Sequence, residues 1–460
     1  MTRLSDLIRP GTTRGLDFVN LEELRKRTGI NPESILKFAC AEILCNALDT
    51  DASEISITMQ QRDVDFDWLT VSDNGSKKLS LNDVKLILDF DNKASSKRGL
   101  LRVSRGYLGN ALKCIFGYSY ALAESKALNP QEIVIASGLS EFRISLKPNI
   151  VKQVIESEVS NSSREDDGCT SLTVKFPANQ SPNIQALKDL IFATSMVNPN
   201  RKISYNIFGK DQGTLGFNDG EQQIRLETSA LWYNPKQFQN LYDDFLRAAP
   251  ETPIKDFIAL FRGLTAKNVI REILHELNAQ NHDSETNGSV QFFPATPIKE
   301  LTPKVSALFA IMKSHSKPIE KRSIPVVLGM VGEANLEKIR QQNGWQRLRY
   351  VLMKAEKIEC SKSFYCYAKN CESCKEEHTA FPYLVELAVF DRNRNDTEGL
   401  KVYQCVNFMA SMEDIFSKIF DINYRLGRVG IAKGSPVTVL AHLVCPVLKW
   451  LNYGKSGLDE

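Results

Sequence analysis

Apolar residues recur at the spacing of an α-helix in the segment 31–49, where Ile35, Ala39 and Ile43 mark the repeat. Pro32 suits the first helical position, because its missing N–H costs nothing there. The pattern predicts a helix that packs an apolar side against a core.

Alternating apolar and polar residues follow this helix in two runs, 55–60 (ISITMQ) and 67–73 (DWLTVSD). Such alternation is typical of half-buried strands. The same criteria predict a helix over 108–116, strands over 144–148 and 171–177, a helix over about 178–195, and a strand over 203–209.

The character of the chain changes twice further on. Residues 225–320 read as largely helical, with a polar loop over 278–289. Strand patterns then return at 382–391, 401–408 and 435–445, and the run 411–427 contains a helix. We therefore expect an α+β protein with domains at 1–220, 221–320 and 321–460.

Composition supports a globular chain of several domains. The 460 residues exceed one ordinary core, and 42% are hydrophobic against 25% charged. No run approaches the ~20 apolar residues of a membrane-spanning helix, and no signal peptide is evident, which predicts a cytoplasmic protein without a membrane partner. The net charge of +3 neither demands nor excludes nucleic acid. Cys40, Cys45 and Cys114 fall in helix-like apolar runs and are expected to be buried thiols.

Three polar side chains share one stripe of the first helix. Glu42, Asn46 and Asp49 are spaced i, i+4 and i+7. On such a stripe one carboxylate can activate a water and an amide oxygen can coordinate a hard cation. Taken alone, the three residues fit a solvated helix face equally well.

A turn and a glycine-containing loop add to this stripe. Asp73-Asn74-Gly75 follows a strand directly, so the carboxylate could accept the exocyclic amine of adenine, although such turns are common. Gly106 and Gly109 flank a loop that opens a helix, whose N–H groups would point at phosphates.

The order of these elements resembles the GHKL ATPases, the family of gyrase. The resemblance implies ATP and Mg²⁺ as cofactors, Glu42 as general base, Asn46 as the Mg²⁺ ligand and Asp73 as the adenine contact. Ser76 to Ser80 lack the glycine that usually follows this turn in the family, and Ala111 replaces a lid glycine. The full expected nucleotide site comprises Glu42, Asn46, Asp49, Asp73, Gly75, Arg105, Gly106, Tyr107, Leu108, Gly109, Asn110, Ala111, Lys113 and Thr170.

Within that family the sequence looks most like the topoisomerase VI B subunit. The run SRGYLGNALK resembles its lid, 184–205 resembles the end of its ATPase domain, and Gly168-Cys169-Thr170 resembles its Gly-Thr box. Lys455 holds the place of the lysine that reaches the γ-phosphate from the transducer domain.

The resemblance implies an architecture and a set of partners. It implies a GHKL (Bergerat) α/β sandwich ATPase domain over 1–220, a helix-two-turns-helix-like region over 221–320 and an α/β transducer over 321–460. Two ATP-bound copies would form a homodimer that gates double-stranded DNA. Cleavage would belong to a separate A subunit with a Toprim domain and a reactive tyrosine.

A cluster of cysteines interrupts the last domain. Cys360, Cys366, Cys371, Cys374 and His378 offer five ligands where structural Zn²⁺ takes four. The C-x2-C pair suits zinc, whereas the wider spacing before it does not, so reduced surface thiols remain the alternative.

Two rival functions stay open. The sequence ends five residues after Lys455, before the long helix that grips the A subunit in the family. Either the last part is missing or the chain couples to its partner differently. A stand-alone GHKL ATPase that clamps or remodels DNA without cutting is therefore the alternative, and a nucleotide-sensing module is a third.

Overall fold

The structure of the 460-residue chain is a computed structural model. It describes residues 8–10, 15–61, 64–90, 92–94, 100–104, 110–178, 183–217, 227–279, 291–359, 379–393, 395–412 and 422–448.

The larger sheet of the described chain has eight strands in the order β10-β9-β2-β3-β8-β5-β6-β7. All neighbouring pairs are antiparallel except β2 with β9, which is parallel. The bounds are β2 Glu54–Gln61, β3 Phe66–Asp73, β5 Ile133–Ser137, β6 Ser140–Asn149, β7 Val154–Ser163, β8 Thr170–Pro177, β9 Lys202–Ile207 and β10 Asp211–Leu215.

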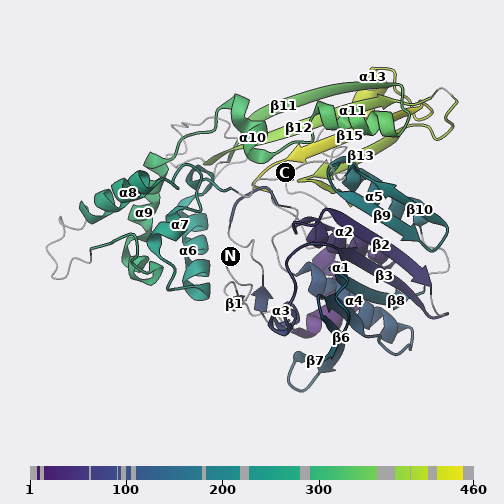
Figure 1. Cartoon of the computed structure of the whole chain (residues 1–460), viewed down its shortest axis with the longest axis horizontal. Coiled ribbons are helices and arrows are strands. Elements are labelled where there is room, and N and C mark those ends of the chain that lie inside the picture. Colours follow the sequence, from purple (N-terminus) through teal and green to yellow (C-terminus); the bar gives the residue numbers. More distant parts are fainter. Residues whose placement is uncertain are drawn as a thin grey trace.

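Helices cover one face of this sheet (Figure 1). The alternation in β2 directs Ile55, Ile57 and Met59 into the core beneath them, whereas Ser56 and Thr58 face away. The described elements around the sheet are β1 Ile8–Pro10, η2 Gly15–Val19, α1 Leu21–Thr28, η3 Pro32–Ser34, α2 Ile35–Leu48, α3 Leu81–Ile87, β4 Asn92–Ala94, α4 Ala111–Ser125 and α5 Ile184–Met196.

Helix α2 is buried on nearly all sides, unlike the half-solvated helix that its polar stripe suggested. Twelve of its 14 residues are buried, and they include Glu42. The cause is packing from several directions, because α2 lies against β2 and β3 on one side and against α4 and α5 on others. Cys40, Cys45 and Cys114 are buried free thiols, as expected.

Glycine at position 117 allows the N-terminal segment to lie directly on α4. A Cβ at Gly117 would sit 1.7 Å from the carbonyl oxygen of Phe18 in η2. Gly117→Ala should therefore lower the free energy of unfolding by about 1–3 kcal/mol, as overpacking of a tight contact does. Urea denaturation of the whole chain measures this. The control is Gly427→Ala, at a helical glycine with open space around it, which should raise the free energy of unfolding by up to about 1 kcal/mol. Equal effects of the two changes on the free energy of unfolding would refute the packing argument.

A helical region follows the first sheet and lies to one side of it (Figure 1). Helix α6 begins with a capping box between Asn234 and Gln237 and has proline at its first position. The core of this helical region is aromatic, and the rings of Phe238 and Phe309 are stacked with 4.4 Å between their centroids. The described elements are η4 Ala230–Trp232, α6 Pro235–Ala248, α7 Ile254–Ile258, α8 Lys267–Ala279, η5 Ile298–Lys304 and α9 Val305–His315.

The last part of the chain contains a second sheet, which lies across the other two parts in Figure 1. Its five described strands run in the order β11-β12-β15-β13-β14, and only β13 and β15 pair in parallel. The bounds are η6 Lys321–Ser323, α10 Ile324–Leu328, α11 Glu333–Gln342, β11 Arg347–Glu359, β12 Thr379–Asp391, β13 Lys401–Val406, β14 Met409–Ala410, α13 Ile422–Arg428 and β15 Val437–Val444.

A buried hydrogen bond between a glutamate and a histidine lies inside this second sheet. Glu386 of β12 and His442 of β15 are 1% and 0% exposed, and Glu386 Oε2 is 2.9 Å from His442 Nδ1. The carboxylate also accepts hydrogen bonds from the N–H groups of Val331 and Gly332 and from the Tyr350 hydroxyl, at 2.8–2.9 Å. Glu386 thus links β12 and β15 to β11 and to the loop before α11.

The predicted α+β class is confirmed, with strands at both ends of the chain and helices between them. The expected strands at 55–60, 67–73 and 382–391 are present as β2, β3 and β12. No described helix has both the length and the apolar character needed to cross a membrane. The domain limits at 220 and 320 stay a proposal.

Candidate nucleotide-binding site

Helix α2 presents the predicted stripe along its length. Glu42 is only 7% exposed, whereas Asn46 and Asp49 lie at the surface. From Glu42 to Asp49 the helix rises about 10 Å. The stripe therefore runs from an enclosed carboxylate at one end to accessible polar groups at the other.

Asp73 ends β3 beside the C-terminus of α2. Its Oδ1 accepts a hydrogen bond from the Gly75 N–H at 3.0 Å and lies 3.3 Å from the Thr50 hydroxyl. A Cβ at position 75 would lie 2.8 Å from both oxygens, so this contact requires glycine. Burial raises the pKa of Asp73, and the two hydrogen bonds oppose the rise.

Thr170 lies directly across from Asp73 on the neighbouring strand β8. Its hydroxyl is 2.9 Å from that of Ser137, which in turn accepts the Leu79 N–H at 2.8 Å. Lys78 completes this end of the sheet, because its ammonium donates to the carbonyls of Gly75 and Gly168. The turn after β3 and the Gly168–Thr170 run are thereby held together.

The start of α4 contains polar atoms without partners. Asn110 occupies the N-cap position but makes no capping hydrogen bond. It is 1% exposed, and neither its Nδ2 nor its Oδ1 has a hydrogen-bond partner among the described residues. A buried amide left in this state costs free energy unless a ligand or water completes it.

Lys113 follows one turn into the same helix. It is 2% exposed, and its ammonium donates to the main-chain carbonyl of Asp89. The predicted contact of Lys113 with phosphates stays a prediction.

Two contacts bring the three elements together. Thr50, just past the end of α2, touches Asp73. Helix α2 also packs against α4. Burial raises the pKa of the Cys114 thiol, in the first turn of α4, to about 12, and the charge of Glu42 adds to the rise. Asp73 therefore contacts the turn that follows α2, and α4 packs on the same helix.

Further residues fix the C-terminal turn of α2, and the sequence reasoning missed them. Asp51 Oδ1 accepts the Ser76 N–H at 2.7 Å, and the Arg201 guanidinium donates to the Thr50 carbonyl at 3.1 Å. Asp51 follows the stripe directly and could have been suspected. Nothing in the sequence links Arg201 to Thr50, because they are far apart in the chain.

Several predicted residues lie outside the described residues. Arg105, Gly106, Tyr107, Leu108 and Gly109 are among them, as is Lys455. So is the whole candidate zinc set Cys360, Cys366, Cys371, Cys374 and His378. Among the residues that the structure does describe, no group of His, Cys, Asp and Glu could hold a metal ion.

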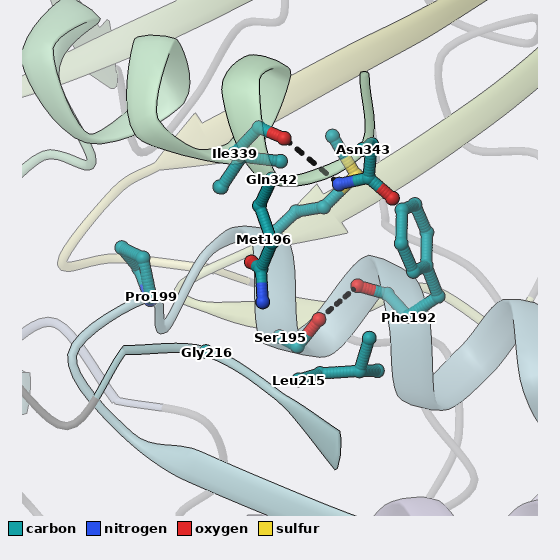
Figure 2. Close-up of a pocket in the computed structure, with 9 residues that line it drawn as sticks. All are labelled: Phe192, Ser195, Met196, Pro199, Leu215, Gly216, Ile339, Gln342 and Asn343. Atoms are coloured by element: carbon teal, nitrogen blue, oxygen red, sulfur yellow. Dashed lines mark hydrogen bonds between the residues drawn. The ribbon is translucent and has the colours of Figure 1, made fainter. Parts of the chain in front are cut away.

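A small pocket lies elsewhere, between α5, β10 and α11 (Figure 2). Phe192 and Met196 line it from α5, and Ile339 and Asn343 from α11 and its end. Its cavity volume of about 10 Å³ is room for about one water molecule. No predicted site residue lines it, and it is too small for a nucleotide.

The donor set on α2, β3 and α4 fits a magnesium nucleotide. Asp73 is an acceptor for an amine, Asn46 offers a surface amide oxygen, and Asn110 has buried polar atoms to satisfy. Mg²⁺ bound with a nucleotide needs only one or two protein oxygens, since phosphates and waters supply the rest.

The sequence matches no family model and no curated protein. Solved structures match along most of the chain. One of them is the N-terminal domain of a DNA repair protein, which is 11% identical in sequence and has a TM-score of 0.39. That match covers 93% of this chain and 87% of the other. The gyrase B subunit of Myxococcus xanthus matches at 7% identity over 93% of this chain and 84% of that subunit's chain, with a TM-score of 0.37. A third match is the ATP-binding domain of topoisomerase IV from Francisella tularensis, in complex with a small-molecule inhibitor. It is 11% identical in sequence, covers 96% of this chain and 86% of the other, and has a TM-score of 0.34. At these scores the likeness is too weak to assign the chain to a family.

Proposed function

We propose that this chain binds and hydrolyses ATP as a GHKL-type ATPase. The observation that carries the proposal is the meeting of three elements. Asp73 with Gly75 lies at the C-terminal end of α2, and Glu42 lies at the middle of that helix. Asn110, whose side chain has no hydrogen-bond partner among the described residues, begins α4, and α4 packs against α2. A turn, a helix stripe and a helix start that are separate in sequence thus lie on or beside two helices that pack against each other.

The sheet end would bind the base. Asp73 Oδ1 is held by Gly75 and Thr50, which leaves Oδ2 to accept the exocyclic amine of adenine. Thr170 stands opposite in register and adds a hydroxyl. Gly75 lets the main chain lie close to the base, because a side chain there would collide with Asp73.

The start of α4 and the polar stripe of α2 would hold the phosphates and the reacting water. N–H groups at the start of α4, after Asn110, favour anionic oxygens through the helix dipole. Asn46 would supply an oxygen ligand to Mg²⁺, which would neutralise phosphate charge. Glu42 would take a proton from the water that attacks the γ-phosphorus, releasing ADP and inorganic phosphate.

The finer assignment is a topoisomerase VI-like B subunit that forms an ATP-dependent homodimer around DNA. Its support is the resemblance of the SRGYLGNALK run and of the segment around Lys455. The alternative is a stand-alone GHKL ATPase that clamps DNA without strand cleavage. Co-purification with a Toprim-containing A subunit would favour the first, and DNA-stimulated hydrolysis without such a partner would favour the second.

Exchanging the adenine carboxylate tests base recognition. Asp73→Asn removes a charged acceptor and should weaken ATP binding about 10- to 100-fold, the effect of one charge-assisted hydrogen bond, while GTP binding changes less. Competition for a fluorescent ATP analogue measures both affinities. Asp211→Asn, on the edge strand β10 of the same sheet, should leave both unchanged. An unaltered preference for ATP over GTP in Asp73→Asn would refute adenine recognition by Asp73.

A further inference from the structure

Strand β11 is an outer strand of the second sheet. Its 13 residues pair with β12 over their whole length, and no other described strand pairs with it. In Figure 1 it runs along the upper rim of the molecule, away from the first sheet. An outer strand presents a row of main-chain N–H and C=O groups that can pair with a further strand. The rim of the second sheet is therefore a candidate surface for strand addition.

The other outer strands of the two large sheets, as far as the chain is described, have features that discourage such pairing. Strand β14 has two residues and β10 has five, so each offers only a short edge. Strand β7 is longer, with ten residues, but Glu156 and Glu158 are exposed along it. Short strands and charged side chains are common means by which proteins protect sheet edges.

The middle of β11 has neither kind of protection. At 13 residues the strand is about twice as long as a typical one. The segment 350–353 carries no charge, and the whole strand contains neither proline nor glycine. Val351 and Met353 lie on the same side of the strand and are 53% and 51% exposed. A long outer strand with half-exposed apolar side chains at its centre is typical of an interaction surface.

The exposed side of β11 continues an apolar surface of the second sheet. Val351 and Met353 lie in register with Leu387 and Val385 of β12. Val385 is buried in a cluster that includes Leu426 of α13, so α13 covers the neighbouring part of this face. A strand added beside β11 would extend the same apolar face past its present rim.

The charges of β11 favour a second copy of the chain as the added strand. The segment 347–349 carries two arginines and no acidic residue, whereas 356–359 carries two glutamates and one lysine. A two-fold axis makes the two copies of β11 antiparallel, which places the basic end of one copy beside the acidic end of the other. Parallel pairing would place like ends together.

We propose that the chain forms a homodimer in which β11 pairs antiparallel with β11 of a second copy. The two second sheets would then become one continuous sheet across the two-fold axis. With the axis near Leu352, Val351 of each copy lies opposite Met353 of the other on the exposed side. This dimer needs no nucleotide, so it is independent of the ATP-dependent homodimer considered under the proposed function.

Adding charge to the centre of β11 tests the interface. In the double variant Val351→Lys, Met353→Lys, each new lysine lies opposite a lysine of the other copy, and like charges in such pairs destabilise a sheet. The dissociation constant of the nucleotide-free dimer should rise at least about 10-fold. Sedimentation equilibrium of the whole chain at several protein concentrations measures it.

The matched control adds the same charge at another exposed apolar site. Ile150 and Val151 lie between β6 and β7 and are 75% and 94% exposed. The double variant Ile150→Lys, Val151→Lys should leave the dissociation constant within about 2-fold of wild type, because a rise from net charge alone would appear in both double variants. The melting temperature shows that each variant is folded, and if the β11 double variant is not, Met353→Lys alone decides.

Each outcome is decisive for the inference. A wild-type chain that stays monomeric without nucleotide at up to about 100 μM would overturn it, as would an unchanged dissociation constant in the folded β11 variant. An equal rise in the control variant would overturn it as well. A dimer that forms only with an ATP analogue and ignores the β11 lysines would overturn this interface and support the ATP-dependent one. A nucleotide-free dimer sensitive to β11, in a chain that does not hydrolyse ATP, would support the interface and overturn the proposed function.

Discussion

Replacement of Glu42 by glutamine is expected to lower ATP turnover by about 100- to 10,000-fold, the range for loss of a positioned general base. The glutamine has nearly the same size and keeps an oxygen, so the buried site should stay intact. ATP affinity should change little, because Asp73 and the start of α4 are untouched. Single-turnover hydrolysis with and without duplex DNA measures the effect.

An exposed glutamate provides the control for this change. Glu54→Gln, on β2 where Glu54 forms a surface ion pair with Lys202, should leave turnover unchanged. Equal rates for wild type and Glu42→Gln would remove Glu42 from the catalytic role. Loss of ATP binding in Glu42→Gln would show that the carboxylate serves structure or affinity instead.

Removal of Glu386 is expected to be the most destabilising single change in the second sheet. Glu386→Ala leaves four buried donors without their acceptor, namely His442, Tyr350 and the main-chain N–H groups of Val331 and Gly332, so the free energy of unfolding should fall by about 3–5 kcal/mol. Chemical denaturation measures this. Glu320→Ala, which breaks an ion pair with Arg322 in which both side chains are exposed, should cost less than about 1 kcal/mol.

Stability should also depend on pH through Glu386. Burial acts to raise its pKa, but His442 and the N–H groups of Val331 and Gly332 outweigh burial and hold the pKa below the ordinary 4.5. A carboxyl with a lowered pKa in the folded state contributes stability above pH 4.5 and loses it as the pH falls through the lower value. Glu386→Ala should therefore show a weaker loss of stability below pH 4.5 than wild type. A parallel acid dependence in both proteins would contradict this reasoning.

Much of the fold was predictable because it depends on local periodicity. The alternation in β2, β3 and β12 and the helical repeat of α2 place their apolar residues in the core found in the structure. Strands β7 and β10 gave little signal, because they lie at the sheet edges and have few buried residues. The near-complete burial of α2 was also hidden, since it results from α4 and α5 packing on it.

The site was predictable only in part, for a related reason. Glu42, Asp73 and Asn110 could be found from local patterns: a helix stripe, a turn and a helix start. Thr50 and Arg201 act through contacts with residues 23 and 151 positions away in the sequence, which local patterns do not contain. The ammonium of Lys113 donates to the Asp89 carbonyl, and its contact with the phosphates stays a prediction.

The most direct test of the nucleotide site is an experimental structure of the whole chain with a non-hydrolysable ATP analogue and Mg²⁺. The account predicts adenine against Asp73 and Gly75, the metal beside Asn46, and phosphates at the start of α4 with Asn110 now hydrogen-bonded. A nucleotide bound elsewhere, or the analogue in this place with its base away from Asp73, would contradict it.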